Sequence, residues 1–141
     1  MPALEPLLQT VTTWAMRRTE IAGVALVGSW ARGTAGPSSD VDLMFLTPNS
    51  LEFRESFAWL AEINWLDLGV AVDSYSDADY GLVWSRHVKL SDGTRLEFTF
   101  AHPSWAATYP CDAGTRSVVS GGCRILFDPA HLLQDVVAHA V

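Results

Sequence analysis

The sequence predicts an α+β fold, in which a mixed and largely antiparallel sheet carries its helices on one face. Three observations predict it. Helix-like and strand-like segments alternate in the first half of the chain, two segments show the apolar–polar alternation of half-buried strands, and Asp92-Gly93 separates apolar runs as in a β-hairpin. The 141 residues suit one domain, which we expect to span residues 1–141.

The N-terminal segment predicts a helix followed by a buried strand. Residues 4–20 are amphipathic, and their apolar side chains fall at helical spacing: Leu7, Leu8, Val11, Trp14 and Ala15. Gly23 ends this pattern, and residues 24–27 are a short apolar run that is typical of a buried strand. Residues 30–33 are expected to form a short helix before a loop.

Residues 40–47 predict a second strand by strict alternation. One face carries Val41, Leu43 and Phe45, and the other carries Asp40, Asp42 and Met44. Ser50 is expected to cap a helix that runs to about Asn64, with a buried side formed by Phe53, Phe57, Leu60 and Ala61.

The next segment predicts a β-hairpin. Residues 65–79 give an ambiguous pattern, although residues 70–72 suit a short strand. Residues 82–90 and 95–101 predict two strands joined by the Asp-Gly turn. On the second of these strands, one face carries Leu96, Phe98 and Phe100, and the other carries Arg95, Glu97 and Thr99.

The C-terminal segment predicts a second hairpin and a final helix. The strands of this hairpin are expected at residues 117–120 and 123–127, on either side of a Gly-Gly pair. Asp128-Pro129 is expected to start the helix, which reaches about Ala138.

The charge balance excludes some classes of protein. The chain has 16 acidic and nine basic residues, for a net charge of -7, and its one lysine is Lys89. General nucleic-acid binding needs a basic surface, so we expect none. An acidic surface suits a protein that holds divalent cations, although solubility is the simpler interpretation.

Other bulk features predict a cytoplasmic protein. Cys111 and Cys123 form no C-x-x-C pair or zinc-ligand spacing, so we expect free thiols. The N-terminus shows no signal-peptide pattern, and no apolar run is long enough for a membrane span. The six tryptophans are either core residues or part of an apolar surface covered by a partner.

Three features predict a site for phosphoryl chemistry. Gly28-Ser29 follows a strand at a possible helix start, where backbone N–H groups and a hydroxyl can bind phosphate oxygens. Asp40 and Asp42 lie on one strand face, and two close carboxylates repel each other unless a cation lies between them. Glu97 joins them if its strand is a neighbour, and two Mg²⁺ ions could then clamp the attacking and leaving oxygens of an in-line displacement.

Simpler interpretations of these carboxylates exist, and other phosphate-binding and metal-binding motifs are missing. A lone Asp-x-Asp is usually a solvated turn, and Asp42 lacks the following residues of a calcium-binding EF-hand loop. No glycine-rich dinucleotide motif follows a strand, and no Walker lysine is present. His87 and Lys89 share one strand face with each other, and that face is either solvated or in contact with substrate.

Residues 28–33 (GSWARG) and 39–43 (SDVDL) together resemble the signature of the DNA polymerase beta-like nucleotidyltransferase superfamily. These two motifs are most similar to those of minimal nucleotidyltransferases and antibiotic nucleotidyltransferases. The strand of Glu97 is similar to the strand that carries the third acidic residue of the family's site. The resemblance implies that Asp40, Asp42 and Glu97 hold two magnesium ions. It also implies that Glu97 helps to deprotonate the acceptor. The phosphates of the nucleotide would be bound by Gly28, Ser29 and Arg32.

The resemblance also implies a reaction. A nucleoside monophosphate, expected to be AMP from ATP, would pass to a hydroxyl acceptor with release of pyrophosphate. The acceptor is expected to be a small molecule, and the acidic surface favours a cationic one such as an aminoglycoside- or lincosamide-like antibiotic. Many relatives carry a C-terminal helical domain, and we expect only one helix here after Asp128, so a homodimer or a helical protein partner could complete the acceptor pocket.

Two other functions stay open. The chain could be a minimal nucleotidyltransferase antitoxin that acts on a HEPN-type toxin partner. It could also be a catalytically inactive nucleotide-binding module, although the intact set of Asp40, Asp42 and Glu97 argues against that.

Overall fold

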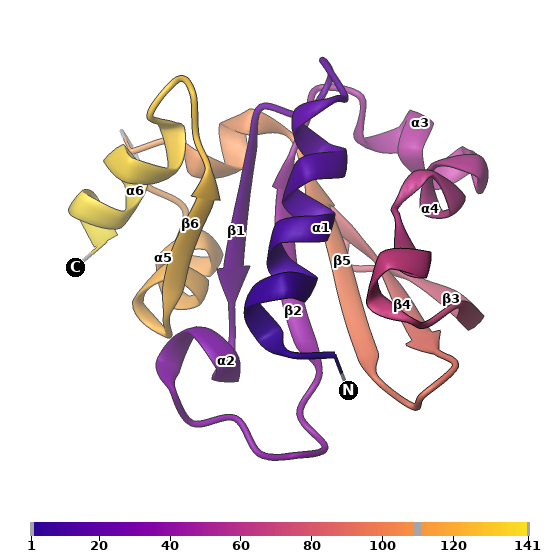
Figure 1. Cartoon of the computed structure of the whole chain (residues 1–141). Helices are drawn as coiled ribbons and strands as arrows, with labels where there is room; N and C mark the ends of the chain where they lie inside the picture. The colour runs from indigo at the N-terminus through magenta and orange to yellow at the C-terminus, as the bar shows by residue number, and fades with distance from the viewer. Residues whose placement is uncertain (1, 109–110, 141) are drawn as a thin grey trace.

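The computed structural model describes residues 2–108 and 111–140, which form one six-stranded sheet with helices on both sides (Figure 1). The strand order is β3-β4-β5-β2-β1-β6. The strands are β1 (Gly23–Val27), β2 (Val41–Leu46), β3 (Val72–Asp79), β4 (Val83–Leu90), β5 (Arg95–Ala101) and β6 (Cys123–Phe127). The helices are α1 (Leu4–Met16), α2 (Ser29–Arg32), α3 (Ser50–Glu55), α4 (Ala58–Glu62), α5 (Ala113–Ser120) and α6 (Leu132–Ala140), with 3₁₀ turns η1 (Trp65–Leu68) and η2 (Pro103–Ala106).

The pairing of the strands is mixed and largely antiparallel, as the sequence predicts. Strands β2 and β5 run parallel, whereas β1 pairs antiparallel with both β2 and β6, and β4 pairs antiparallel with both β3 and β5. The hairpin between β4 and β5 turns at Gly93, whose φ of +91° favours glycine. The fold class is therefore confirmed.

One face of the sheet is covered by α1, α3, α4 and η1. The apolar side of α1 is the predicted one, and it packs on the residues of β2 and β5 that alternate inward. This layer is rich in aromatic rings, which contact one another at the centre of the core: Trp14, Phe45, Phe53, Trp59, Trp84, Phe98 and Phe100. Four of the six tryptophans are buried, so the core interpretation holds for these four.

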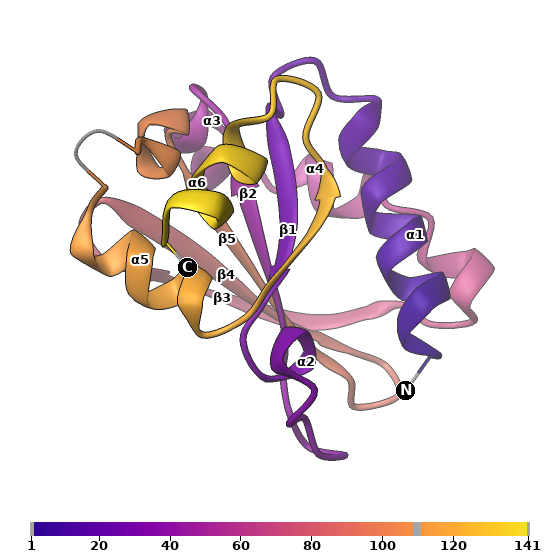
Figure 2. The ribbon, with the colours of Figure 1, turned by 90° about the vertical axis from the view of Figure 1, so that its left-hand side faces the viewer.

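The opposite face is covered only at one end, which corrects the expectation that the helices share one face. Residues of α5, α6 and η2 pack on Ala25, Met44 and Leu46, so helices lie on both sides of the β1–β2 end (Figure 2). From the sequence, the β2 face of Asp42 was treated as polar. Beyond Asp42, however, this face carries the apolar residues Met44 and Leu46, which are buried under the second layer. At the β3–β5 end of the same face, Ser74, Lys89 and Arg95 are exposed.

The helix predicted between Ser50 and Asn64 is interrupted. It forms two short helices, because the guanidinium of Arg86 donates hydrogen bonds to the carbonyls of Arg54 and Ser56 where α3 ends. The first cap position is Asn49 rather than Ser50. Two side chains expected on the buried side are exposed as a result: Phe57 and Ala61.

The second predicted hairpin is wrong. Residues 113–120 form helix α5, whose N-terminus is capped by Asp112 through a hydrogen bond from the Thr115 backbone N–H. Strand β6 pairs with β1 instead of with a neighbour in sequence. The last helix is present, and both carboxylate oxygens of Asp128 accept hydrogen bonds from its first turn.

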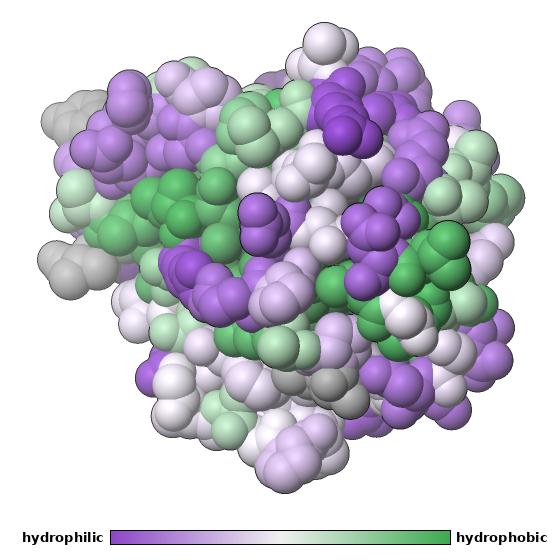
Figure 3. All heavy atoms as spheres, viewed as in Figure 1, coloured by the Kyte–Doolittle hydropathy of each residue, from purple (hydrophilic) through white to green (hydrophobic). Residues whose placement is uncertain are grey.

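The ambiguous segment contains a longer strand than expected. Strand β3 spans eight residues and forms one edge of the sheet, and β6 forms the other. On the side of the molecule that α1 covers, hydrophilic surface surrounds separate apolar areas, and a large one lies over β6 and α6 (Figure 3). In the part of the chain that the structure describes, no helix is long and apolar enough to cross a membrane.

Candidate active site

A cleft of about 460 Å³ lies on the sheet face that α5 only partly covers. Its floor is formed by residues of β2, β4 and β5, and its sides by the β1–α2 turn and by α5. Polar side chains from the floor include Asp42 and Glu97, whereas Tyr80, Leu82 and Trp105 add apolar surface at the rim. The cleft therefore combines carboxylates with an apolar wall, as small-molecule sites often do.

Asp42 and Glu97 are direct neighbours across parallel strands. They occupy paired positions on β2 and β5, and both side chains line the cleft. Burial is the largest cause that raises the pKa of Asp42, and together with the charge of Glu97 and a hydrogen bond with Glu97 it brings this pKa to about 7. The more distant Asp40 acts in the same direction, and Arg32 acts in the opposite one. Two carboxylates held so closely attract either a proton or a cation.

Gly28 brings the backbone against this pair. Its φ is +76°, and a Cβ built there would overlap the Oδ2 atom of Asp42. Only glycine combines this conformation with so close an approach. Gly28 precedes α2, whose first N–H groups start at Ser29; Gly28 lines the cleft, whereas Ser29 is not among its lining residues.

Asp40 lies at the start of β2 and faces a cation. Its Oδ1 atom is 2.9 Å from Nε of Arg95, without the geometry of a hydrogen bond. The same oxygen is buried and has no hydrogen-bond partner among the described residues. The structure thus places Asp42 and Glu97 together and holds Asp40 against Arg95.

The donor set can be compared with the needs of Mg²⁺. As the side chains stand in residues 2–108 and 111–140, no three His, Cys, Asp or Glu residues form a metal-ion site. The chemistry nevertheless fits a hard cation, because two adjacent carboxylates and a buried oxygen without a hydrogen bond, on Asp40, lie at one end of β2. The metal-binding roles of Asp40, Asp42 and Glu97 stay a prediction.

Arg32 is a further lining residue of the cleft. Its Nη1 donates a hydrogen bond of 3.0 Å to the carbonyl of Gly121 at the end of α5. A Cβ on Gly122 would overlap the Arg32 side chain, so this Gly-Gly turn lets the arginine pack closely. Arg32 and Asp42 line the same cleft, and the charge of Arg32 lowers the pKa of Asp42.

Several lining residues were not anticipated from the sequence. Residues 117–120 of α5 were predicted to be a strand, and Ser117 and Val118 were not predicted as site residues, although they line the cleft. The signal that could have found this helix is Asp112, an N-cap residue. His87 on β4 is paired with Glu97 on β5, and the Nε2 atom of His87 is 3.7 Å from Oε1 of Glu97.

Comparisons with known proteins bear on this geometry. A family model of a nucleotidyltransferase domain matches residues 13–104. The crystal structure of an aminoglycoside 6-adenyltransferase from Bacillus subtilis has a similar fold, with a TM-score of 0.50 and 14% sequence identity. The similarity covers 72% of this chain and 36% of that one, and at this identity it shows the fold alone. No curated protein matches the sequence.

The family match extends over most of the sheet and both halves of the site. It includes the turn at Gly28, the strand of Asp42 and the strand of Glu97. These are the elements that the cleft brings together. The chain belongs to the nucleotidyltransferase domain family.

Proposed function

We propose that this chain transfers a nucleoside monophosphate, AMP from ATP, to a hydroxyl of a small-molecule acceptor in a magnesium-dependent reaction. The observation that carries the proposal is the pairing of Asp42 with Glu97 beside the Gly28 backbone. Membership of the family gives the reaction type. The adenylyl donor is supported by the similar fold of an adenyltransferase.

Asp40, Asp42 and Glu97 would hold the metal ions. Asp42 and Glu97 would supply carboxylate oxygens from two neighbouring strands, and the buried Oδ1 atom of Asp40 would be a further ligand. Two Mg²⁺ ions bound there would neutralise charge on the triphosphate and on the attacking oxygen. Asp42, whose pKa burial and Glu97 raise to about 7, would give up its proton when the cation binds.

Gly28, Ser29 and Arg32 would bind the phosphates. The first N–H groups of α2 follow the turn at Gly28, and the cleft that Gly28 and Arg32 line would take the phosphate oxygens. Arg32 is oriented by its hydrogen bond to Gly121 and keeps a guanidinium at the cleft. These groups position the triphosphate on the β1 side of the carboxylates.

The bonds that change follow from this placement. The acceptor oxygen attacks the α-phosphorus, forming a new oxygen–phosphorus bond. The bond from the α-phosphorus to the bridging oxygen breaks, and pyrophosphate leaves with that electron pair. The hydroxyl proton passes to the carboxylate of Glu97, which lines the cleft next to Asp42.

A transfer assay tests the proposal. Purified protein, Mg²⁺ and ATP labelled at the α-phosphate are mixed with a panel of hydroxyl acceptors and with candidate helical protein partners. We expect labelled product from wild type, a loss of more than about 100-fold in Asp42→Asn, and little change in Asp67→Asn, which removes an exposed carboxylate from η1.

Two results would contradict the proposal. One is wild-type protein that neither labels any acceptor nor binds Mg-ATP in a calorimetric titration. The other is Asp42→Asn protein that transfers label as fast as wild type. Label on a protein partner, with none on small molecules, would favour the antitoxin-type activity instead.

A further inference from the structure

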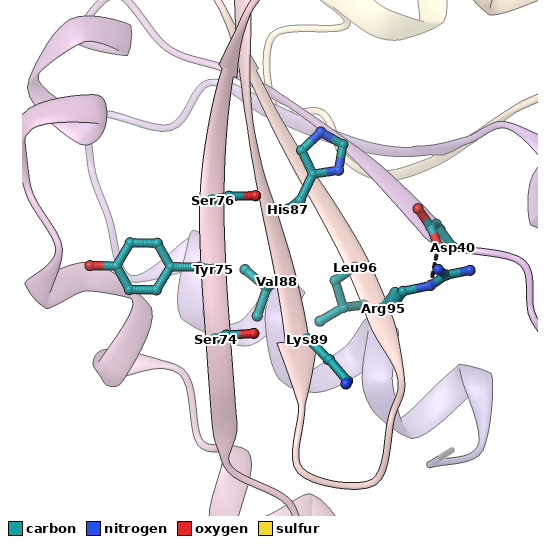
Figure 4. A pocket seen from close by; sticks show the side chains of 9 residues that line it. All are labelled: Asp40, Ser74, Tyr75, Ser76, His87, Val88, Lys89, Arg95 and Leu96. Atoms are coloured by element: carbon teal, nitrogen blue, oxygen red, sulfur yellow. Dashed lines mark ion pairs between the residues drawn. The ribbon is translucent and has the colours of Figure 1, made fainter.

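A second concavity, of about 300 Å³, lies on the same sheet face beside the carboxylates (Figure 4). It is formed by β3, β4 and β5 near the β4–β5 turn, and Asp40 lies at its β2 side. Besides the Asp40 carboxylate, which is paired with Arg95, its polar lining comes from Ser74, Ser76, His87, Lys89 and Arg95. Apart from Asp40, none of these residues has a role in the phosphate or metal sites described above.

The strand register places these side chains on one face. Ser74 is paired with Lys89, Ser76 with His87, and Lys89 with Arg95, and paired residues on antiparallel strands point to the same side. In Figure 4 the side chains of both serines point toward β4, whereas the Tyr75 ring points the other way. Two hydroxyls, an imidazole and two cationic groups therefore share the concavity.

Lys89 carries a positive charge that the protein does not neutralise. It is exposed, it is the one lysine of the chain, and it has no hydrogen bond or ion pair with any described residue. Arg95 is partly engaged, since it pairs with Asp40 and its Nη2 donates a 2.7 Å hydrogen bond to the Ser38 carbonyl. On a protein with a net charge of -7, an unpaired ammonium beside hydroxyls is suited to bind an anion.

The concavity lies on one side of the Asp42–Glu97 pair, and Gly28, where the triphosphate is proposed to bind, lies on the other side. The strand order runs from β4 through β5 and β2 to β1, so Gly28 after β1 and Lys89 on β4 flank the Asp42–Glu97 pair. Nε2 of His87 is 3.7 Å from Oε1 of Glu97, which links the concavity to the carboxylate that would receive the proton. A molecule bound there would present a hydroxyl to the α-phosphorus from the acceptor side.

We propose that Lys89, with Arg95, Ser74 and Ser76, binds a phosphate group of the acceptor, so that the acceptor is a small phosphorylated hydroxyl compound such as a sugar phosphate. This inference rests on the proposed transfer reaction. The acceptor hydroxyl loses its proton to Glu97 and bonds to the α-phosphorus, pyrophosphate leaves, and the acceptor's own phosphate is unchanged.

Size and charge select this class of acceptor. A volume of about 300 Å³ is at the small end of ligand sites and suits a single sugar phosphate. A cationic antibiotic would be repelled by the positively charged Lys89 ammonium, although the net charge of the chain by itself favours a cationic acceptor. A nucleic acid, as a long polyanion, would be disfavoured by the net charge of -7.

Calorimetric titration of the full chain tests the inference, with ribose 5-phosphate as the probe and ribose, glucosamine and a short oligonucleotide as comparisons. We expect wild type to bind ribose 5-phosphate at least about tenfold more tightly than ribose or glucosamine. Lys89→Gln should weaken this binding about tenfold and Lys89→Arg should retain most of it. Arg17→Gln removes an exposed cation after α1, under the other face of the sheet, and should change nothing.

A labelling experiment on wild-type protein gives a second measurement that needs no variant. An amine-reactive reagent modifies Lys89 as the only lysine side chain, and peptide mass spectrometry separates it from the N-terminal amine. Ribose 5-phosphate should slow the modification of Lys89 several-fold, and ribose should not.

The two proposals fail separately. Asp42→Asn should abolish transfer of AMP while ribose 5-phosphate still binds, so loss of transfer activity in wild type counts against the proposed reaction alone. Equal binding of ribose 5-phosphate and ribose, equal binding by Lys89→Gln, or tighter binding of the oligonucleotide would overturn the acceptor inference. Mg-ATP binding that stays intact in Lys89→Gln shows that the variant is folded.

Discussion

Gly28 and Asp42 form the closest approach in the candidate site. The glycine has a φ of +76°, and the space that a Cβ would fill is occupied by the Asp42 carboxylate. Gly33 has the same φ of +76° with no atom near its Cβ position. Their ψ angles differ, however, at -155° for Gly28 and 20° for Gly33, so alanine at Gly28 would meet both a backbone region that is essentially limited to glycine and the Asp42 carboxylate.

Alanine at each glycine tests this difference. Gly33→Ala should destabilise the protein by about 1 kcal/mol, which is the cost of a left-handed non-glycine residue. Gly28→Ala should cost about 1 kcal/mol or more beyond that and should also weaken Mg-ATP binding, because it moves a proposed metal ligand. Urea denaturation and calorimetry measure the two effects, and identical behaviour of both variants would contradict the close contact.

The protonation of Asp42 makes stability depend on pH. Burial and the Glu97 charge raise the pKa of Asp42 from 3.8 to about 7, so the folded chain binds this proton more tightly than the unfolded chain. The stabilisation from the bound proton is complete below about pH 4 and is lost as the pH rises through 7.

Asp42→Asn should remove this dependence. Without metal, the free energy of unfolding of wild type should fall between pH 4 and pH 7 by on the order of 1–2 kcal/mol more than that of the variant, after allowance for the partial exposure of the carboxylate. Added Mg²⁺ should restore wild-type stability at pH 7. Parallel stability curves for the two proteins would show that Asp42 is not perturbed.

Some residue positions could be predicted from the sequence, and others could not. The period-2 alternation placed Asp42 and Glu97 on polar strand faces, and the family resemblance suggested that their strands are neighbours; the register confirms that they are paired. The ion pair between Asp40 and Arg95 joins residues on two strands through side-chain orientation, which alternation does not specify.

At the scale of elements, Arg86 connects the sheet to the break between α3 and α4. It is fully buried on β4, and its Nε and Nη2 donate to both oxygens of Asp77 on β3 at 2.7 and 3.0 Å. It also donates to the carbonyls of Arg54 and Ser56. Its guanidinium lies 5.1–5.2 Å from the centres of four rings: Phe57, Trp59, Tyr75 and Trp84.

Removal of this guanidinium should be costly. Arg86→Gln leaves Asp77 and two carbonyls without their donors, so we expect a loss of about 3 kcal/mol in the free energy of unfolding. Arg54→Gln removes an exposed ion pair with Asp79 from the same region and should cost less than about 1 kcal/mol. Urea denaturation compares them, and equal losses would show that the buried network adds little.

Elements were predicted well where one face is buried and poorly where partners are remote. The helix α1 and the β4–β5 hairpin follow from local periodicity and turn chemistry, which act within a few residues. Strand β6 was predicted to pair with residues 117–120, which form the end of α5, because a Gly-Gly pair lies between the two segments. Its true partner β1 lies about a hundred residues earlier, and pairing at such a distance leaves no local pattern.

At the scale of the whole molecule, helices cover most of one sheet face and cover the other only beside β1 and β2. This arrangement leaves the cleft and the Lys89 concavity side by side on the exposed part of the second face. The chain spans 36% of the similar adenyltransferase, so the organisation of residues 1–141 as a complete domain, and the partner that could cover this face, stay predictions.

The most direct test of the central claim is a crystal structure with Mn²⁺ and a non-hydrolysable ATP analogue, in which anomalous scattering locates the metal. We predict peaks within about 2.3 Å of carboxylate oxygens of Asp42 and Glu97, with Asp40 as a further ligand and the phosphates against Gly28 and Ser29. A nucleotide that binds elsewhere, or bound Mn²⁺ that contacts neither Asp42 nor Glu97, would contradict the account.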